Sequence, residues 1–195
     1  MRSAKAYNQV MDHKLSAKES GLRGILRGYG SVAVAFSGGV DSSLLLEVAH
    51  EALGENVLAV TACMAGLPAR ELRAAEGFCA ERGIPHLLMG FDEFAVDGFA
   101  ENSPERCYLC KRALLSMMKA MAMGQGVGVL AEGSNLDDES EHRPGRAAVR
   151  ELGAAHAAWQ ITALLDGGAP GIHLYTLNMA ELCLRIVELV RESRF

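Results

Sequence analysis

The sequence has no apolar run that approaches the ~20 residues needed to cross a bilayer, so we expect no membrane-spanning segment. Residues 1–8 include basic side chains, but no apolar stretch follows them, and no secretory signal is indicated. A basic excess is also missing. The 19 Lys and Arg stand against 24 Asp and Glu, and the net charge of -5 argues against a nucleic-acid-binding surface.

The five cysteines are an odd number and do not form the pattern of a disulfide framework in a chain of 195 residues. We therefore expect a reducing compartment, the cytoplasm. Cys107 and Cys110 form a Cys-x-x-Cys pair, which suits one edge of a zinc or iron–sulfur site, or a redox pair. Because a complete metal site needs more ligands, the pair predicts only part of a cluster site.

Two common phosphate-binding motifs are absent, the Walker loop and the Gly-x-Gly-x-x-Gly dinucleotide fingerprint. Instead, the apolar run 32–36 leads into Ser-Gly-Gly-Val-Asp-Ser-Ser at residues 37–43, and apolar residues then continue at helical spacing. This order predicts a strand, a tight glycine turn and a helix N-terminus, where backbone N–H groups and the helix dipole attract anions. The alternative is an ordinary strand–helix turn with a capping side chain.

The pattern along the chain alternates strands and helices, which favours an α/β fold with a doubly wound parallel sheet. We expect one or two short helices within 10–26, interrupted at Gly21, strands at 32–36, 57–61, 84–89 and 127–131, and helices at 40–53, 69–82 and 105–123. The remaining residues predict a short helix at 147–152, a helix at 158–165, a strand at 172–177 and a last helix at 179–191. The expected fold is therefore a doubly wound sheet with an additional C-terminal strand–helix.

Three loops lie at the carboxyl ends of predicted strands: 37–43, 62–68 and 133–138. In a doubly wound sheet such strand ends meet at one crevice. Carboxylates there are hard oxygen ligands suited to Mg²⁺ on nucleotide phosphates, and the candidates are Asp41, Asp137 and Asp138. Candidate cationic partners of pyrophosphate are Arg106, Lys111 and Arg143. The alternatives are a solvated acidic loop and ordinary surface charges.

Five segments occur in the order found in the LarE family of PP-loop ATP pyrophosphatases, which are ATP-dependent sulfur transferases: 34–43, 59–62, 106–111, 133–138 and 143–145. The sequence resembles that family over about residues 10–153. The resemblance implies an adenine nucleotide alpha hydrolase-like fold, with ATP and Mg²⁺ as cofactors. It also implies adenylation of a small carboxylate, followed by sulfur delivery from a cysteine of the chain or through an iron–sulfur cluster.

The resemblance assigns roles to individual residues. It implies phosphate binding by the loop residues Ser37, Gly38, Gly39, Asp41, Ser42 and Ser43, and an adenosine side lined by Thr61 and Ala62. It implies closure of the nucleotide site by Gly133, Ser134, Asn135 and Asp138. The expected catalytic residues are Asp41, Arg106 and Lys111, and the expected metal contacts are Asp41 and Asp137 for Mg²⁺, with Cys107 and Cys110 for a partial cluster.

The C-terminal tail departs from that family, whose members carry a further catalytic region with a Cys-x-Ser-Arg-type segment that residues 154–195 do not match. Residues 160–185 resemble the last strand and helix of methylenetetrahydrofolate reductase, a flavin enzyme. We expect a PP-loop ATP-binding domain at 1–153 and a helix–strand–helix extension at 154–195. Two alternatives to an enzyme stay open. One is a nucleotide-binding module without turnover, whose missing half a partner chain supplies. The other is a folate- or flavin-linked protein. Family analogy implies a homo-oligomer.

Overall fold

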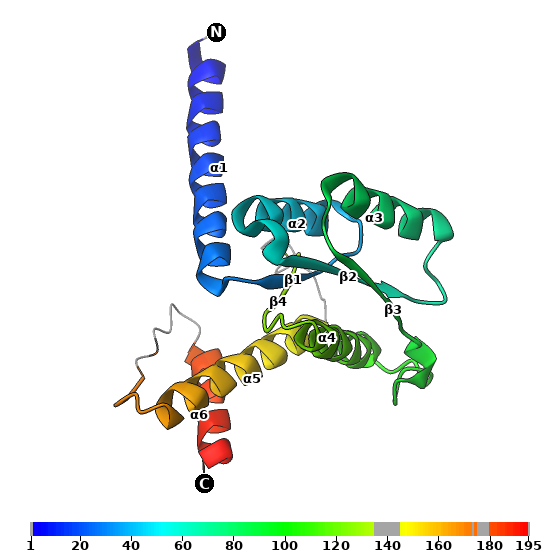
Figure 1. Ribbon diagram of the computed structural model, residues 1–195, viewed down its shortest axis with the longest axis vertical. Helices are drawn as coiled ribbons and strands as arrows, with labels where there is room; N and C mark the ends of the chain where they lie inside the picture. The colour runs from blue at the N-terminus through cyan, green and yellow to red at the C-terminus, as the bar shows by residue number, and fades with distance from the viewer. Residues whose placement is uncertain (1, 135–144, 173, 175–179, 195) are drawn as a thin grey trace. The chain divides into compact units, whose positions relative to one another are not determined.

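The computed structural model describes residues 2–134, 145–172, 174 and 180–194 of the chain (Figure 1). The chain divides into two compact units. We name the first, Met1–Glu93 with Met117–Glu141, the sheet unit, and the second, Phe94–Ser116 with His142–Phe195, the helical unit. None of the described helices is long and apolar enough to cross a membrane.

The sheet unit is built on four parallel strands in the order β3-β2-β1-β4. Their bounds are β1 Val32–Ala35, β2 Val57–Cys63, β3 His86–Gly90 and β4 Leu130–Glu132. The helices α2 (Val40–Leu53) and α3 (Ala69–Arg82) connect β1 to β2 and β2 to β3, as the alternating pattern predicts. The predicted α/β class with a doubly wound parallel sheet is confirmed.

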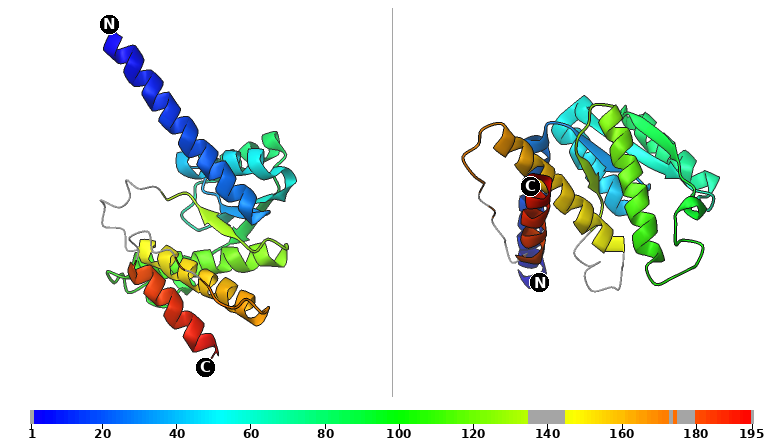
Figure 2. Two further views of the ribbon diagram at one scale, coloured as in Figure 1. Left: turned by 90° about the vertical axis from the view of Figure 1, so that its left-hand side faces the viewer. Right: turned by 90° about the horizontal axis from the view of Figure 1, so that it is seen from below.

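Helices cover both faces of this sheet, which is why the central strands β1 and β2 are almost wholly buried. The helices α2 and α3 lie on one face, and the end of α4 (Arg106–Gly124) lies on the other (Figure 2). Between α2, α3 and the strands lies a continuous core whose fully buried members include Val32, Val34, Leu46 and Val57. The N-terminal helix α1 (Arg2–Tyr29) joins this core through Leu22 and Leu26.

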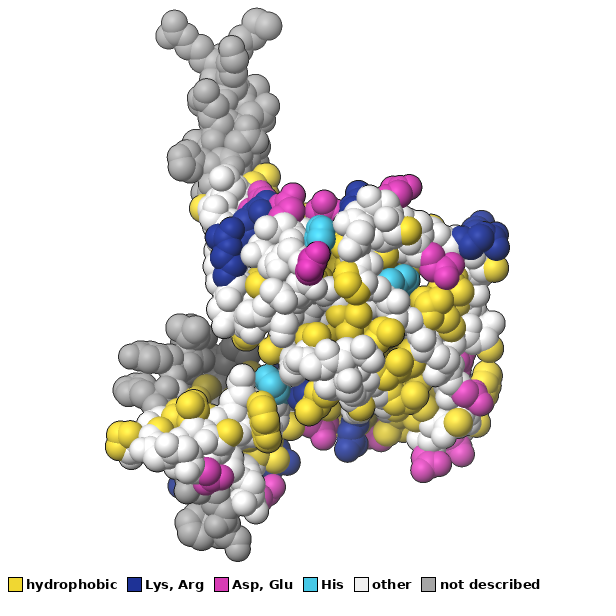
Figure 3. Space-filling view, viewed as in Figure 1, with side chains coloured by type: hydrophobic (Ala, Val, Ile, Leu, Met, Phe, Trp, Pro, Cys, Tyr) yellow, Lys and Arg dark blue, Asp and Glu magenta, His cyan; other side chains and the backbone are white. Residues whose placement is uncertain are grey.

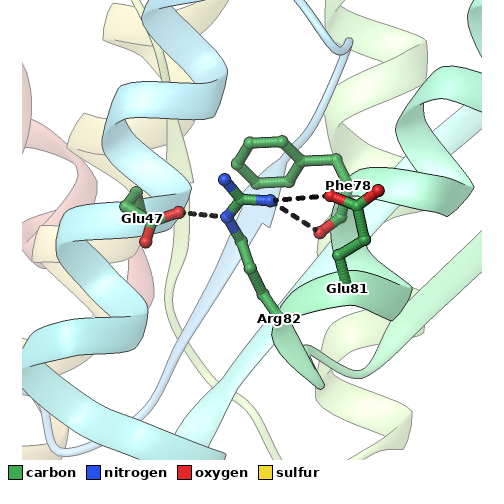
Figure 4. A network of polar contacts seen from close by, with 4 residues as sticks. All are labelled: Glu47, Phe78, Glu81 and Arg82. Atoms are coloured by element: carbon green, nitrogen blue, oxygen red, sulfur yellow. Dashed lines mark hydrogen bonds and ion pairs between the residues drawn. The ribbon is translucent and has the colours of Figure 1, made fainter.

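A network around Arg82 joins α3 to α2 (Figure 4). Its Nε donates to Glu47 on α2 over 2.5 Å, and one terminal nitrogen donates to the Phe78 carbonyl over 3.4 Å. The guanidinium carbon also lies 3.8 Å from the Phe78 ring centroid. The charge of Arg82 is thus paired, hydrogen-bonded and stacked on a ring, and its side chain links α3 to α2 at the side of the core.

The helical unit contains the first half of α4, together with α5 (Gly145–Asp166) and α6 (Ala180–Arg194). The Tyr108 hydroxyl on α4 donates to the Glu151 carboxylate on α5, and this contact raises the pKa of Tyr108. The contact between α5 and α6 buries Ala154, Ala158 and Ile186, with half-buried aliphatic side chains packed around them. Large apolar side chains remain on the surface, and Trp159 is 63 % exposed.

Edge strand β3 leaves part of its apolar surface exposed. Its Leu88 is 40 % exposed although it lies within a strand. Figure 3 shows hydrophobic side chains gathered on the face of the molecule where this strand runs. An edge strand has a neighbour on one side only, so its side chains are covered less completely than those of β1 and β2.

Four sequence predictions differ from the structure. The one or two short helices expected within 10–26 form the single helix α1, which continues through Gly21. The predicted helices 147–152 and 158–165 form one helix, α5, because Ala154 and Ala158, just after Gly153, pack against Ile186 on α6. Strand β4 lies later than the predicted 127–131. Of the predicted strand 172–177, the described residues Ile172 and Leu174 are not in a strand, and the others lie outside the described residues. The division at residue 153 and the tail's resemblance to the reductase stay predictions.

Candidate functional site

The strand order places a topological switch point between β1 and β4. From β1 the chain runs through α2 to β2 on one side, whereas β4 pairs with β1 on the other side. Ligands of open α/β sheets bind outside the carboxyl ends of strands at such a point. The PP-loop, residues 37–43, is separated from β1 by Phe36 alone, and Gly133 and Ser134 directly follow β4. The structure therefore brings these predicted site residues to one edge of the sheet.

Gly133 lies against the first turn of α2. A Cβ atom at this position would be 2.9 Å from the Ser42 nitrogen and 3.0 Å from the Asp41 carbonyl carbon. Contacts this short to backbone atoms leave no room for any side chain, so only glycine lets β4 approach the helix N-terminus. The predicted role of Gly133 in nucleotide binding stays a prediction, but its place beside the PP-loop is now given by geometry.

Hydrogen bonds inside the PP-loop fix its shape. The Ser42 hydroxyl donates to the Gly39 carbonyl over 3.1 Å and accepts from the Ser37 N–H over 3.3 Å. Since Ser42 has one hydroxyl proton, the 3.1 Å contact between the two serine hydroxyls is donated by Ser37. The Ser37 hydroxyl oxygen in turn accepts from the Gly39 N–H over 3.3 Å. Ser42 is 6 % exposed and braces the loop from inside, whereas Ser37 is exposed.

The chain reverses direction at Gly38, whose φ of +76° is a conformation that side chains disfavour. Gly39 is the N-cap of α2 and has extended backbone angles. Beyond it, Asp41 is exposed in the first helical turn, where the helix dipole stabilises a carboxylate. N–H groups in a first turn have no partner within the helix. The loop is thus a backbone cradle for an anion with one carboxylate at its rim.

Thr61 and Ala62 are the neighbouring predicted site residues on β2, and both are buried. The Thr61 hydroxyl donates to the Phe36 carbonyl over 2.7 Å, so its proton is used inside the protein. Its predicted place on the adenosine side stays a prediction. His86 on β3 joins the same contact, with Nε2 2.8 Å from the Thr61 Oγ1. No motif in the sequence singles out His86, because its contact with Thr61 joins two strands that are far apart along the chain.

The predicted residues of segment 106–111 lie in the first turns of α4, within the helical unit. Arg106 donates to the Asn102 side chain over 2.9 Å and lies over the Phe99 ring. Cys107 is exposed, Cys110 and Lys111 are half-buried, and both cysteines are free thiols. No set of three or more metal-ligating side chains occurs within the described part of the chain, so the iron–sulfur prediction gains no support. The catalytic roles of Arg106 and Lys111 stay predictions.

Four of the predicted side chains, Asn135, Asp137, Asp138 and Arg143, lie outside the described residues.

Curated proteins of similar sequence and solved structures of similar fold were found for this chain. A pyridinium-3,5-bisthiocarboxylic acid mononucleotide synthase of Lactiplantibacillus plantarum is 33 % identical over 141 residues, which are 72 % of this chain and 51 % of that protein. The chain is LarE-like. An uncharacterized Synechocystis protein is 35 % identical over 139 residues, covering 71 % of this chain and 52 % of that protein. The LarE-like chain thus spans about half the length of the curated relatives that it matches, and no protein-family model matches it.

Solved structures share the fold at low sequence identity. An NH3-dependent NAD synthetase of Campylobacter jejuni superposes with a TM-score of 0.53 at 14 % identity, over 94 % of the LarE-like chain and 96 % of the synthetase. A glutamine-dependent NAD+ synthetase of Acinetobacter baumannii, solved with ADP, gives 0.51 at 22 % identity, over 61 % of this chain and 25 % of that one. The predicted adenine nucleotide alpha hydrolase-like fold is confirmed.

Proposed function

We propose that this LarE-like chain binds ATP at the PP-loop and uses it in a reaction that forms AMP and pyrophosphate. The observation that carries the proposal is the contact of Gly133 with the first turn of α2. It closes the anion cradle from a second strand at the switch point, where nucleotides bind in sheets of this kind. The similarity to a mononucleotide synthase and the fold shared with NAD synthetases support the same conclusion.

The PP-loop backbone would hold the triphosphate, with Gly38 and Gly39 allowing close approach and Ser37 offering an exposed hydroxyl. Asp41 is the described residue best suited to Mg²⁺, since it presents a carboxylate at the rim of the cradle. When bound, the ion would neutralise charge on the phosphates. The second proposed Mg²⁺ contact, Asp137, lies outside the described residues.

The substrate proposed for adenylation is a small carboxylate, and a pyridine carboxylate is the class that the relative's name supports. One carboxylate oxygen attacks the α-phosphorus of ATP, the bond from that phosphorus to the β-bridging oxygen breaks, and pyrophosphate leaves. Arg106 and Lys111 are proposed to balance the charge that develops on the leaving group. In the finer proposal, a sulfur nucleophile then attacks the acyl carbon of the adenylate and AMP departs.

A narrower function is nucleotide binding without turnover. It is favoured by one observation, that the match covers only about half of the relatives' length. Under this alternative a partner chain would supply the groups that use the bound ATP. We also propose a reducing, cytoplasmic location, because Cys63, Cys79, Cys107, Cys110 and Cys183 are all free thiols.

The test measures binding and turnover separately on the full chain. Calorimetry with ATP and MgCl₂ should give a stoichiometric site, and addition of nicotinate-type carboxylates should release pyrophosphate and AMP in equal amounts. The variant Asp41→Asn should weaken ATP binding at least tenfold, whereas Glu55→Gln, an exposed acid just beyond the other end of the same helix, should not change it. Binding without pyrophosphate would support the narrower function, and absence of binding would reject both.

A further inference from the structure

A chain of polar contacts runs from β3 through β2 to Phe36, the residue that precedes the PP-loop. His86 at the start of β3 contacts the hydroxyl of Thr61 on β2 over 2.8 Å. That hydroxyl donates over 2.7 Å to the carbonyl of Phe36, the residue between β1 and the loop. Thr61 is 4 % exposed, so water does not compete for its hydroxyl. We name this set, His86, Thr61 and the Phe36 carbonyl, the relay.

The direction of each hydrogen bond in the relay follows from counting protons. Thr61 has a single hydroxyl proton, and the Phe36 carbonyl, which can only accept, takes it. The contact between His86 and Thr61 must therefore be donated by the histidine, which requires a proton on Nε2. Burial lowers the pKa of His86, against a smaller opposing effect of Glu76, and this favours the neutral ring with that proton.

The relay reaches the loop through one peptide group. The Phe36 carbonyl and the Ser37 N–H belong to the same planar unit and point in opposite directions. The carbonyl accepts from Thr61, and the N–H donates to the Ser42 hydroxyl over 3.3 Å. Rotation of this peptide would break both bonds at once. The Phe36–Ser37 peptide is therefore held on one side by the hydrogen bond from Thr61 and on the other by the hydrogen bond to Ser42.

Packing keeps the histidine at its end of the relay. The Phe36 ring meets the His86 ring edge-on, with the centroids 6.1 Å apart, and lies 5.3 Å from the Phe78 ring. Phe36 itself is 2 % exposed. The ring of His86 thus has an apolar neighbour on one side, and its Nε2 is directed at a hydroxyl rather than at solvent.

We propose that His86 is a positioning residue for the PP-loop, acting through Thr61 to fix the Phe36–Ser37 peptide and hence the groups that face the ligand. The effect on a phosphate ligand rests on the proposed function, whereas the effect on the loop does not. Since loss of one well-formed hydrogen bond weakens an interaction by roughly tenfold, the expected change in affinity is moderate.

The experiment compares two substitutions of His86. In His86→Gln the amide nitrogen lies as many bonds from Cβ as the histidine Nε2, so the hydrogen-bond donor is kept. In His86→Leu an apolar side chain fills the space and the donor is lost. We expect the Ser37 amide resonance to move in the leucine variant and to stay close to the wild-type position with glutamine. We also expect ATP to bind about tenfold more weakly to the leucine variant and nearly normally to the glutamine variant.

A second measurement needs neither nucleotide nor substitution. Long-range nitrogen–proton correlation on the wild-type chain reports the tautomer of His86, and a proton on Nε2 is expected. A proton on Nδ1 alone would overturn the proposal, and so would equal behaviour of the two variants at Ser37. Should His86→Leu fail to fold, the pair Thr61→Ser and Thr61→Val gives the same comparison one step along the relay. If the wild-type chain binds no ATP, the proposed function fails while the tautomer and the Ser37 amide still decide the relay.

Discussion

The two units of this chain are stabilised in different ways. The sheet unit buries large β-branched and aliphatic side chains between a parallel sheet and its helices, and several of them are completely inaccessible. The helical unit packs α5 against α6 through a smaller cluster, in which Ala154, Ala158 and Ile186 are the buried members. The contrast indicates that the sheet unit has a rigid scaffold for a precise loop. The helical unit depends more on individual polar contacts such as that between Tyr108 and Glu151.

The largest difference should appear on removing one leucine from each unit. Leu46 on α2 is 0 % exposed, so Leu46→Ala should lower the free energy of unfolding by about 2–5 kcal/mol, because a cavity replaces its contacts. Leu184→Ala, at an exposed site on α6, should change it by no more than about 0.5 kcal/mol. Urea unfolding followed by circular dichroism measures both. Trp159 is the single tryptophan, so its fluorescence reports the helical unit separately. Equal losses in the two variants would contradict the contrast.

A second comparison replaces one glycine in each unit by alanine. Gly133→Ala should cost about 1–3 kcal/mol by overpacking, since the new methyl group would meet the backbone of α2. It should also weaken ATP binding by more than tenfold if the cradle binds phosphate. Gly153→Ala lies within α5 with open space around it, and it should raise stability by about 0.5–1 kcal/mol. Thermal unfolding and calorimetry with ATP measure these effects. Unchanged stability and ATP affinity in Gly133→Ala would show that the end of β4 can move away from the first turn of α2 without consequence.

Sequence reasoning succeeded where a pattern is local and failed where a contact joins distant strands. The Ser-Gly-Gly turn at residues 37–39 predicts the loop because glycine conformation and helix start lie within a few positions. The motif order places Gly133 on the same edge, but it does not reveal that a methyl group there would meet the Ser42 nitrogen. The partnership of His86 with Thr61 depends on the register of β2 and β3, in which Ala59 lies opposite His86. No spacing in a single sequence specifies that register.

The same distinction explains the errors in the tail. The segment around Gly153 contains a residue that often ends helices, and its neighbours read as two short helices. In the structure Ala154 and Ala158 pack against Ile186 on α6, and this tertiary contact keeps the helix continuous. Local propensity alone does not predict such a contact, because it depends on a helix some 30 residues further along the chain.

A smaller effect is expected from the polar contact that joins α4 to α5. Tyr108→Phe keeps the ring and removes the hydroxyl that donates to Glu151, so it should lower the stability of the helical unit by about 1 kcal/mol. Arg112 stays near Glu151, at 3.8 Å, and limits the loss. Urea unfolding followed by Trp159 fluorescence is the appropriate measurement. A shift in the unfolding of the sheet unit as large as that in the helical unit would mean that the two units unfold together.

The smallest expected effect is the contribution of His86 to the pH dependence of stability. Burial holds the pKa of this histidine below its ordinary value, so the unfolded chain binds a proton more readily than the folded chain between those two values. The wild-type free energy of unfolding should therefore decline as pH falls below about 6.5 and level off once the folded histidine is also protonated. His86→Gln removes the contribution of this histidine to the pH dependence of the free energy of unfolding. Urea unfolding of both proteins from pH 7.5 to 5 should show the wild-type chain losing stability relative to the variant. Parallel curves would mean that the ring is as accessible to protons in the folded chain as in the unfolded one. The relay would then lack the buried, neutral histidine that distinguishes this strand from the exposed surfaces of the helical unit.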